Sequence, residues 1–215
     1  MKVARFTFNP FYENCYVLWQ AEGGDAYVVD PGMMNDQEQN ALVAFLDEKK
    51  LSVSAILLTH MHIDHVAGAR WLAQKYSAEI MTHVAEELLG LQLVHQAERF
   101  HLQVDTRPVT ITRYLRQDDE LLLADEPLRV LETPGHSPGS LSFHAPQSRF
   151  VLTGDAVFAM SIGRTDLPGG DFNQLISSIQ TQILSLPEDV MILPGHADAT
   201  TVGQERAHNP YVKMP

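Results

Sequence analysis

The most constraining feature of the sequence is the run Thr-His-Met-His-Ile-Asp-His at residues 59–65. It directly follows residues 53–58, a short apolar segment whose composition predicts a buried strand. Three imidazoles and one carboxylate therefore fall within six positions after a strand end. Imidazole nitrogen and carboxylate oxygen are ligands that zinc and iron accept in proteins. The run predicts a metal site at the end of this strand.

The ligand types in the run divide into two pairs. His60 and His62 stand two positions apart, so in an extended or looped backbone their rings can point to the same side. Asp64 and His65 fall where a helix is expected to begin, and they must point elsewhere. One run can therefore serve two adjacent metal ions. The competing interpretation is that these are ordinary surface histidines, in a chain that has ten.

Three apolar segments in the second half of the chain also lead to a potential metal ligand. Residues 128–131 lead to His136, residues 150–153 to Asp155, and residues 190–193 to His196. Sites in α/β sheets gather outside the carboxyl ends of strands, and the glycine before each of these residues allows a tight turn. Each residue alone also fits a turn, a helix cap or a loop. Together with the first run, they predict that four strand ends meet at one metal centre.

The charge of these candidates suits two divalent ions. The set comprises His60, His62, Asp64, His65, His136, Asp155 and His196. Five neutral histidines and two aspartates carry −2, and a bridging hydroxide would make −3 against +4 from the ions. The small positive remainder suits a site that attracts an anionic substrate and stabilises an oxyanion.

Strand and helix patterns alternate in both halves of the chain, which indicates an α/β or α+β fold with helices covering the sheets. We expect further strands at residues 3–8, 15–19, 26–29 and 78–81, and an edge strand at 109–112. We expect helices at residues 36–49, 66–76, 83–99 and 171–186. The halves have similar numbers of elements, which predicts two facing sheets with helices outside. No linker interrupts the sequence, so we expect one domain over residues 1–215.

Composition excludes several classes of partner. The net charge of −12 disfavours binding to a phosphate backbone, so we expect no nucleic acid partner. Cys15 is the single cysteine and cannot form an internal disulfide. No apolar run approaches the roughly 18 residues of a membrane span, and the N-terminal residues lack a signal-peptide pattern. We expect a cytoplasmic protein without a membrane partner, and the oligomeric state is left open.

The ordered set of motifs resembles the metallo-β-lactamase superfamily. It comprises the run at residues 60–65, Thr-Pro-Gly-His at 133–136, Gly-Asp at 154–155 and Pro-Gly-His at 194–196. The resemblance covers nearly the whole chain and implies an α/β fold, an αβ/βα four-layer sandwich of two mixed sheets with metals at one edge. Within the superfamily, the sequence looks most like the compact, single-domain type of the glyoxalase II branch. Asp155, residues 163–170 and the tail at residues 205–210 carry that finer resemblance.

The resemblance implies a role for each ligand. It assigns His60, His62 and His136 to a first metal ion. It assigns Asp64, His65 and His196 to a second ion, and Asp155 to both. Zinc is the expected metal, and iron or manganese suits the same ligands. The implied reaction is hydrolysis of a thioester such as the glutathione conjugate S-lactoylglutathione, by a metal-bridging hydroxide that Asp64 also orients.

Other residues receive supporting roles. Asp30 is expected to accept a hydrogen bond from a metal-binding histidine. Arg164 is expected to bind a substrate carboxylate, and an internal salt bridge is the alternative. We expect packing roles for Tyr12 and Tyr16, and no metal-binding role for the remaining histidines, which are His83, His95, His101, His144 and His208.

Three other functions remain open at this stage. One is a persulfide dioxygenase with a single iron, which resembles this sequence around residues 163–166. Another is a metal-dependent lactonase or esterase, and the third is a metal-binding protein without catalysis. Long glyoxalase II enzymes carry a C-terminal helical domain that supplies basic residues to glutathione, and this sequence has no such domain before its end at Pro215. The resemblance therefore implies the hydrolytic centre and leaves glutathione recognition open.

Overall fold

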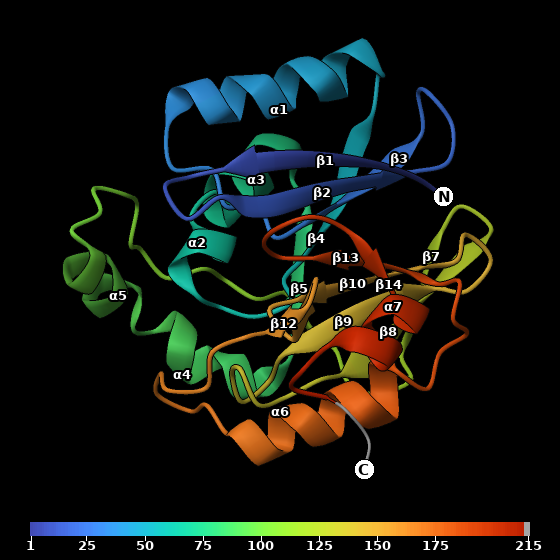
Figure 1. Ribbon diagram of the computed structural model, residues 1–215. Helices are drawn as coiled ribbons and strands as arrows, with labels where there is room; N and C mark the ends of the chain where they lie inside the picture. The colour runs from blue at the N-terminus through green and yellow to red at the C-terminus, as the bar shows by residue number, and fades with distance from the viewer. Residues whose placement is uncertain (213–215) are drawn as a thin grey trace.

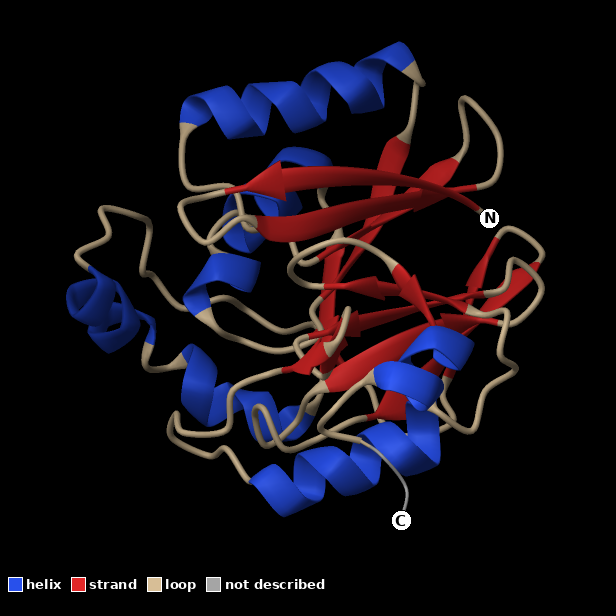
Figure 2. Cartoon of the chain, in the orientation of Figure 1, coloured by secondary structure: helices blue, strands red, loops and turns tan. Residues whose placement is uncertain are grey.

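The computed structural model describes residues 1–212. Two six-stranded sheets face each other in the middle of the molecule, and helices cover their outer faces (Figure 1). Figure 2 shows the same layers by type, with strands inside and helices above and below. The predicted αβ/βα sandwich is therefore confirmed, whereas a single domain over residues 1–215 stays a prediction.

The first sheet contains the N-terminal strands in chain order. They are β1 (Lys2–Phe8), β2 (Glu13–Trp19), β3 (Asp25–Val29), β4 (Ser52–Leu57), β5 (Glu79–Thr82) and β6 (Arg113–Tyr114). The pairs β1–β2 and β2–β3 are antiparallel, and the pairs from β3 to β6 are parallel. This mixture of pairings makes the sheet mixed, as expected.

The second sheet has the order β14-β13-β10-β9-β8-β7. Its strands are β7 (Glu120–Leu123), β8 (Glu126–Glu132), β9 (Leu141–Ala145), β10 (Phe150–Gly154), β13 (Met191–Pro194) and β14 (Thr200–Thr201). A small hairpin lies beside it, formed by β11 (Val157–Phe158) and β12 (Ser161–Ile162). Both β8 and β10 run antiparallel to β9, and β13 runs parallel to β10. The carboxyl ends of β8, β10 and β13 therefore lie at one edge of the sheet, as the sequence predicts.

The helices are α1 (Asp36–Glu48), α2 (Ile63–Val66), α3 (Ala69–Tyr76), α4 (Glu87–Gly90), α5 (Leu93–Phe100), α6 (Phe172–Ser178) and α7 (Val202–His208). All but the last of them lie in connections between strands, and α7 follows the final strand β14. Asn35 caps α1 by accepting from the Glu38 amide, and Asp171 caps α6 by accepting from the Gln174 amide. None of the helices in residues 1–212 combines the length and apolar character that crossing a bilayer requires.

Strand β2 shows why the sheets need cover on both faces. All seven of its residues are buried. Cys15, Val17 and Trp19 pack into the core shared with α1 and α3, whereas Tyr16 and Leu18 pack into the core between the two sheets. Since side chains alternate between faces along a strand, an all-buried strand must have a layer on each side. A third core lies between the second sheet and α6.

Four sequence-based boundaries differ from the structure. The helix expected at residues 66–76 begins only at Ala69, because α2 ends at Val66, and the helix expected at residues 83–99 is divided into a 3-10 turn, α4 and α5. Residues 109–112 are not a strand, and the edge strand is β6 at Arg113–Tyr114. The Thr112 hydroxyl accepts from the Ile80 amide at 3.0 Å, so a side chain occupies the ladder position that a backbone carbonyl would take. The helix expected at residues 171–186 begins as predicted but widens into a π-helical turn at Ile179–Ile183.

The tail at residues 205–210 has a structural role beside the β11–β12 hairpin. Glu205 is fully buried, and its carboxylate accepts from the Met160 amide at 2.9 Å, the Thr200 hydroxyl at 2.6 Å and the Asn209 amide group at 2.8 Å. Asn209 also donates to the Ser161 carbonyl at 3.0 Å. The tail therefore supports the hairpin that directly follows Asp155.

Replacement of Glu205 by Ala should lower the free energy of unfolding by about 2–4 kcal/mol, because buried donors lose their acceptor. The matched control is Glu188→Ala, because Glu188 has a 76% exposed side chain and a surface ion pair with Arg206. The control should change stability by less than about 1 kcal/mol. Urea unfolding followed by circular dichroism measures both. Equal effects of the two substitutions would contradict the structural role of the tail.

Candidate metal centre

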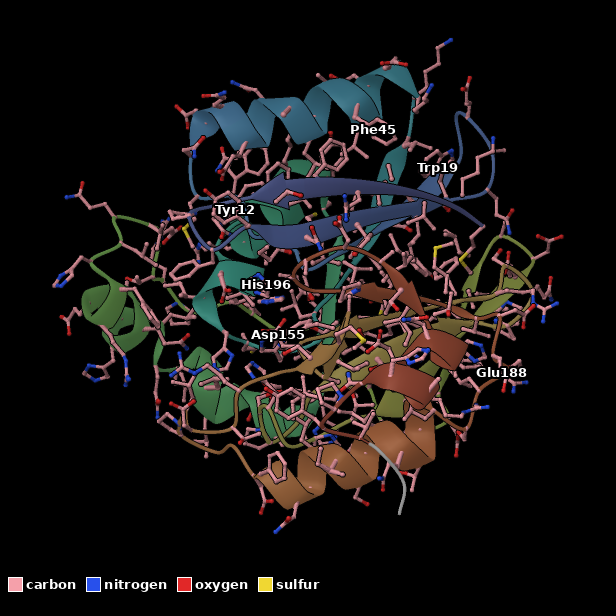
Figure 3. The ribbon with its side chains drawn as sticks, in the orientation of Figure 1. Tyr12, Trp19, Phe45, Asp155, Glu188 and His196 are labelled. Carbon is pink, nitrogen blue, oxygen red and sulfur yellow. The ribbon has the colours of Figure 1, made fainter. Side chains whose placement is uncertain are left out.

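The seven candidate ligands come from loops at the carboxyl ends of four strands. His60 and His62 follow β4, and Asp64 and His65 lie in the first turn of α2. His136, Asp155 and His196 follow β8, β10 and β13. Figure 3 labels Asp155 and His196, which lie close to each other between the two sheets. The convergence of strand ends that the sequence predicts is therefore present in the structure.

The imidazoles of the first group form a compact set. Ligand atoms of His60, His62 and His136 lie within 4.8 Å of one another. The Nδ1 atom of His62 lies 2.8 Å from Nε2 of His136. Burial and the neighbouring His136 lower the pKa of His62 to about 3, so its ring is neutral at physiological pH. Neutral rings are the form that can donate a lone pair to a metal ion.

A second group lies beside the first. Ligand atoms of Asp64, His65 and His196 also lie within 4.8 Å of one another. His196 Nε2 is 3.3 Å from Asp64 Oδ2, and His65 Nε2 is 3.8 Å from the same oxygen. Burial opposes the charged ring of His65, but the carboxylates of Asp155 and Asp64 outweigh it and raise the pKa of His65. A metal ion binding here would therefore displace a proton.

Asp155 lies between the two groups. Its Oδ1 atom is 3.4 Å from His65 Nε2, and its Oδ2 atom is 3.5 Å from His136 Nε2 and 3.6 Å from His196 Nε2. Burial would raise the pKa of Asp155, but the His65 ring outweighs this effect and holds the pKa well below its ordinary value. Asp155 is thus an ionised carboxylate in reach of both groups.

Among the described residues, three buried polar atoms without hydrogen-bond partners indicate whether these residues fit metal ions. His60 Nε2, His65 Nε2 and Asp155 Oδ1 have no hydrogen-bond partner within residues 1–212. Buried polar atoms in proteins are nearly always paired. All three atoms belong to the groups whose donors converge, and divalent cations would satisfy them. The donor set therefore fits two ions held by imidazole and carboxylate.

Asp30 supports the ligands from behind. Its Oδ1 atom accepts from the Thr59 amide at 2.7 Å, and its Oδ2 atom accepts from the Thr59 hydroxyl at 2.6 Å. Its Oδ2 atom also lies 3.0 Å from His65 Nδ1. Asp30 lies within ligand range of His60 and His65, but both of its oxygens are already engaged. This geometry makes Asp30 an orienting residue for His65.

Two of the other imidazoles are held through backbone carbonyls. His136 Nδ1 lies 2.7 Å from the Arg164 carbonyl, and His196 Nδ1 lies 3.0 Å from the Phe11 carbonyl. A carbonyl can only accept, so the Nδ1 atoms carry the protons and the Nε2 lone pairs face the centre. This arrangement fixes both the tautomer and the direction of each ring.

Glycines allow the ligand loops to pack this closely. Gly135, just before His136, has φ of 131°, which other residues rarely adopt, and a Cβ atom there would overlap the Leu175 backbone. A Cβ atom at Gly195, just before His196, would overlap the Asp155 carboxylate and the His65 ring. The Pro-Gly-His motifs therefore bring backbone close to the ligands and to α6.

Glu86 is a supporting residue that sequence reasoning missed. It is fully buried, and its Oε2 atom accepts from the Met61 amide at 2.8 Å. Its Oε1 atom accepts from the Ser137 hydroxyl and the Gly139 amide, both at 2.7 Å. Glu86 thereby joins the loop of His60 and His62 to the loop of His136. A glutamate within a predicted helix carries no local signal for this role.

Glu13 is a second buried acid that sequence reasoning missed. It is fully buried at the start of β2, and neither carboxyl oxygen has a hydrogen-bond partner in the described chain. Burial raises the pKa of Glu13 well above its ordinary value, which favours the neutral form of the group. The strand was expected only at residues 15–19, so nothing in the sequence assigned Glu13 to it.

A cavity of about 240 Å³ opens onto the ligands. Its lining comprises Phe11, His62, Ile63, Asp64, Gln96, Phe100, His136, Asp155, Arg164, Leu167 and His196. Arg164 lines this cavity and also forms a salt bridge, the alternative that the sequence left open. Its Nε atom and one terminal nitrogen each lie 2.7 Å from the Asp166 carboxylate.

The two tyrosines near the centre differ from each other. Tyr16 is buried, and its hydroxyl donates to the Pro194 carbonyl at 2.8 Å, which confirms its packing role. The packing role expected for Tyr12 is wrong, because this residue is 75% exposed. Tyr12 has a left-handed φ of 57° in the turn between β1 and β2, at the end of the hairpin where Figure 3 labels it.

Comparison with known proteins gives one consistent result. Residues 8–196 match the family model of the metallo-beta-lactamase superfamily. The hydroxyacylglutathione hydrolase GloC of Haemophilus influenzae is 36% identical, over 99% of this chain and 98% of that protein. The crystal structure of BLEG-1 B3 metallo-beta-lactamase is similar, with 33% identity, a TM-score of 0.86, and coverage of 99% of this chain and 100% of that one.

A second solved structure, TTHA1623 in a di-iron-bound form, is 34% identical with a TM-score of 0.85. The similarity covers 97% of this chain and 99% of that one. The residues matched by the family model include all seven candidate ligands, from the run after β4 to His196. The family match shows that this chain belongs to the metallo-beta-lactamase superfamily, and the sandwich of two sheets and the convergent candidate ligands agree with it.

Proposed function

We propose that this protein is a metal-dependent thioester hydrolase that acts on a hydroxyacyl thioester such as S-lactoylglutathione. Membership of a superfamily of metallo-hydrolases supports the metal-dependent hydrolysis. The name of the Haemophilus influenzae relative, a hydroxyacylglutathione hydrolase, supports the substrate class.

Seven side chains would hold two divalent ions. His60, His62 and His136 would hold the first ion, whereas Asp64, His65 and His196 would hold the second, with Asp155 shared between them. When bound, such ions supply a nucleophile from water near neutral pH and a Lewis acid for the acyl carbonyl. We propose zinc as the metal. Iron is the alternative for this donor set, because the similar protein TTHA1623 has a di-iron-bound form.

The observation that carries the substrate class is the make-up of the cavity wall. Apart from the proposed ligands, its lining consists of Phe11, Ile63, Gln96, Phe100, Arg164 and Leu167. None of these side chains can give up a proton near neutral pH. A leaving group in this cavity must therefore depart with little proton assistance. A thiolate, with a thiol pKa of about 8.5, meets this requirement, whereas an alkyl amide does not.

Two further residues have proposed roles. Asp64 is a ligand at the start of α2, where the Asn9 side chain donates to the Asp64 carbonyl at 2.9 Å and fixes its backbone. We assign Asp64 the additional role of orienting the attacking water. Arg164 lies at the cavity wall, where its guanidinium can face a substrate carboxylate while Asp166 holds it in place.

A lactamase is the second candidate, because the similar BLEG-1 structure is described as a B3 metallo-beta-lactamase. We expect the purified protein with two zinc ions to hydrolyse S-lactoylglutathione at least about tenfold faster than a chromogenic cephalosporin, because no side chain in the wall can protonate a leaving amine. Absorbance assays on both substrates measure the ratio. Faster lactam cleavage would reject the thioester assignment, and oxygen uptake with glutathione persulfide would favour a dioxygenase.

Asp155→Ala should remove metal and activity together, because this carboxylate is shared by both groups. Elemental analysis should fall from about two ions per chain to one or fewer, with thioester hydrolysis reduced at least about a hundredfold. Asp189→Ala is the control, because Asp189 is 56% exposed and pairs with Arg149 on the surface. Two retained ions with normal turnover in Asp155→Ala would show that the bridging role is wrong.

Asp30→Asn tests the support behind His65. Asparagine tolerates the left-handed φ of 50° at this position, so the backbone stays unstrained. The substitution removes the negative charge that faces the His65 ring, and metal affinity should fall roughly 10–100-fold. Competition with a zinc chelator measures the affinity, and the control is Asp25→Asn, at the exposed start of β3, the strand that precedes Asp30. An unchanged affinity would remove Asp30 from the metal centre.

A further inference from the structure

A second cavity adjoins the first. It has a volume of about 120 Å³, and both cavities are lined by His62, Gln96, Phe100 and Leu167. The two spaces are therefore neighbouring parts of one groove that runs from the ligands along α5. The wall of the second cavity includes the apolar residues Leu89 and Pro168. None of the roles assigned so far uses this space.

Helix α5 is held at a defined position beside the ligand run. Gln96 Oε1 accepts from the Ile63 amide at 2.9 Å, at the start of α2. Its Nε2 atom donates to the carbonyls of Leu89 at 3.1 Å and Met61 at 3.3 Å. The Phe100 ring packs edge-on against Phe11, with ring centres 5.2 Å apart. The face of α5 that lines the groove is thus fixed relative to the metal ligands.

This face presents polar groups at helical spacing. Gln92, Gln96 and Arg99 recur four and three residues apart and all line the second cavity. Two arginines line the groove, and they differ in their partners. Arg164 is paired with Asp166, whereas Arg99 has no carboxylate within 4.0 Å in the described part of the chain. The hydrogen bond from Arg164 lowers the pKa of Asp166 and the Arg99 charge adds to this effect, but Arg99 and Asp166 form no ion pair. In a chain of net charge −12, a guanidinium beside the site that has no ion-pair partner among residues 1–212 attracts an anion.

We propose that the second cavity binds the thiol half of the substrate, and that Arg99 pairs with a carboxylate on that half. This inference rests on the proposed thioester hydrolysis. The small acyl group would occupy the cavity at the ligands, and the thiol half would extend along α5 between Leu89 and Pro168. In the reaction, water adds to the acyl carbon, the C–S bond breaks, and a hydroxy acid carboxylate, a thiol and one proton are released. Arg99 is a specificity-determining residue, because it contacts the carrier and not the reacting atoms.

The kinetic test compares two lactoyl thioesters. One is the glutathione thioester, which carries carboxylates, and the other is the N-acetylcysteamine thioester, which carries none. Arg99→Ala should raise KM for the first about tenfold with kcat unchanged, and should leave both constants for the second unchanged. Arg99→Lys should recover part of the loss. Arg129→Ala, which removes a surface arginine paired with Glu120, is the control and should match the wild type.

A binding measurement separates this inference from the proposed function. Calorimetry with S-methylglutathione, which cannot be hydrolysed, should show about tenfold weaker binding to metal-loaded Arg99→Ala than to the wild type. If this loss occurs but no thioester is hydrolysed, the cavity assignment holds and the proposed reaction fails. If thioesters are hydrolysed but Arg99→Ala changes neither KM nor binding, the cavity assignment is overturned alone. Equal KM increases for both thioesters would also overturn it.

Discussion

The arrangement of the metal centre depends on the hydrogen bonds to the buried carboxylate of Asp30. This residue directly follows β3, and it receives two hydrogen bonds from Thr59, which follows the neighbouring β4. It also faces the His65 ring. Thr59 in turn contacts His60 Nδ1 at 2.9 Å. One carboxylate therefore orients ligands of both proposed metal sites. The Asp30 carboxylate is buried, so each donor that lost this acceptor would cost about 1–3 kcal/mol of stability. This cost holds the two loops in one geometry.

The second requirement is that the two halves of the chain meet in register. The run after β4 belongs to the first sheet, whereas His136, Asp155 and His196 belong to the second. The apolar core between the sheets brings these loops together, and Glu86 links two of them directly. The 2.8 Å approach of His62 Nδ1 to His136 Nε2 shows how closely lone pairs from opposite halves converge. Such a pair is favourable only where a proton or a cation lies between the nitrogens.

Much of this arrangement could be predicted from the sequence, because its signals are local. Apolar runs mark the strands, glycines mark the turns, and the ligands directly follow them, as at Gly195 and His196. The supporting residues could not be predicted, because their roles depend on partners distant in the chain: Glu86 binds the Gly139 amide, 53 positions away. The edge strand begins one residue after the segment predicted for it, because the Thr112 hydroxyl takes the place of a backbone acceptor. The exposure of Tyr12 could not be predicted, because a left-handed turn has no recognisable apolar pattern.

The placement of α5 has a consequence for how this fold can change. The helix lies within residues 83–112, the connection between β5 and β6, whose strands pair in parallel however long that connection is. Gln96 and Phe100 fix the helix, but Gln92 and Arg99 face the groove without supporting any ligand. Substitutions at those two positions can therefore accumulate without disturbing the metal centre. Relatives that share the same hydrolytic chemistry are free to diverge in the molecules they accept, with this connection as the variable part.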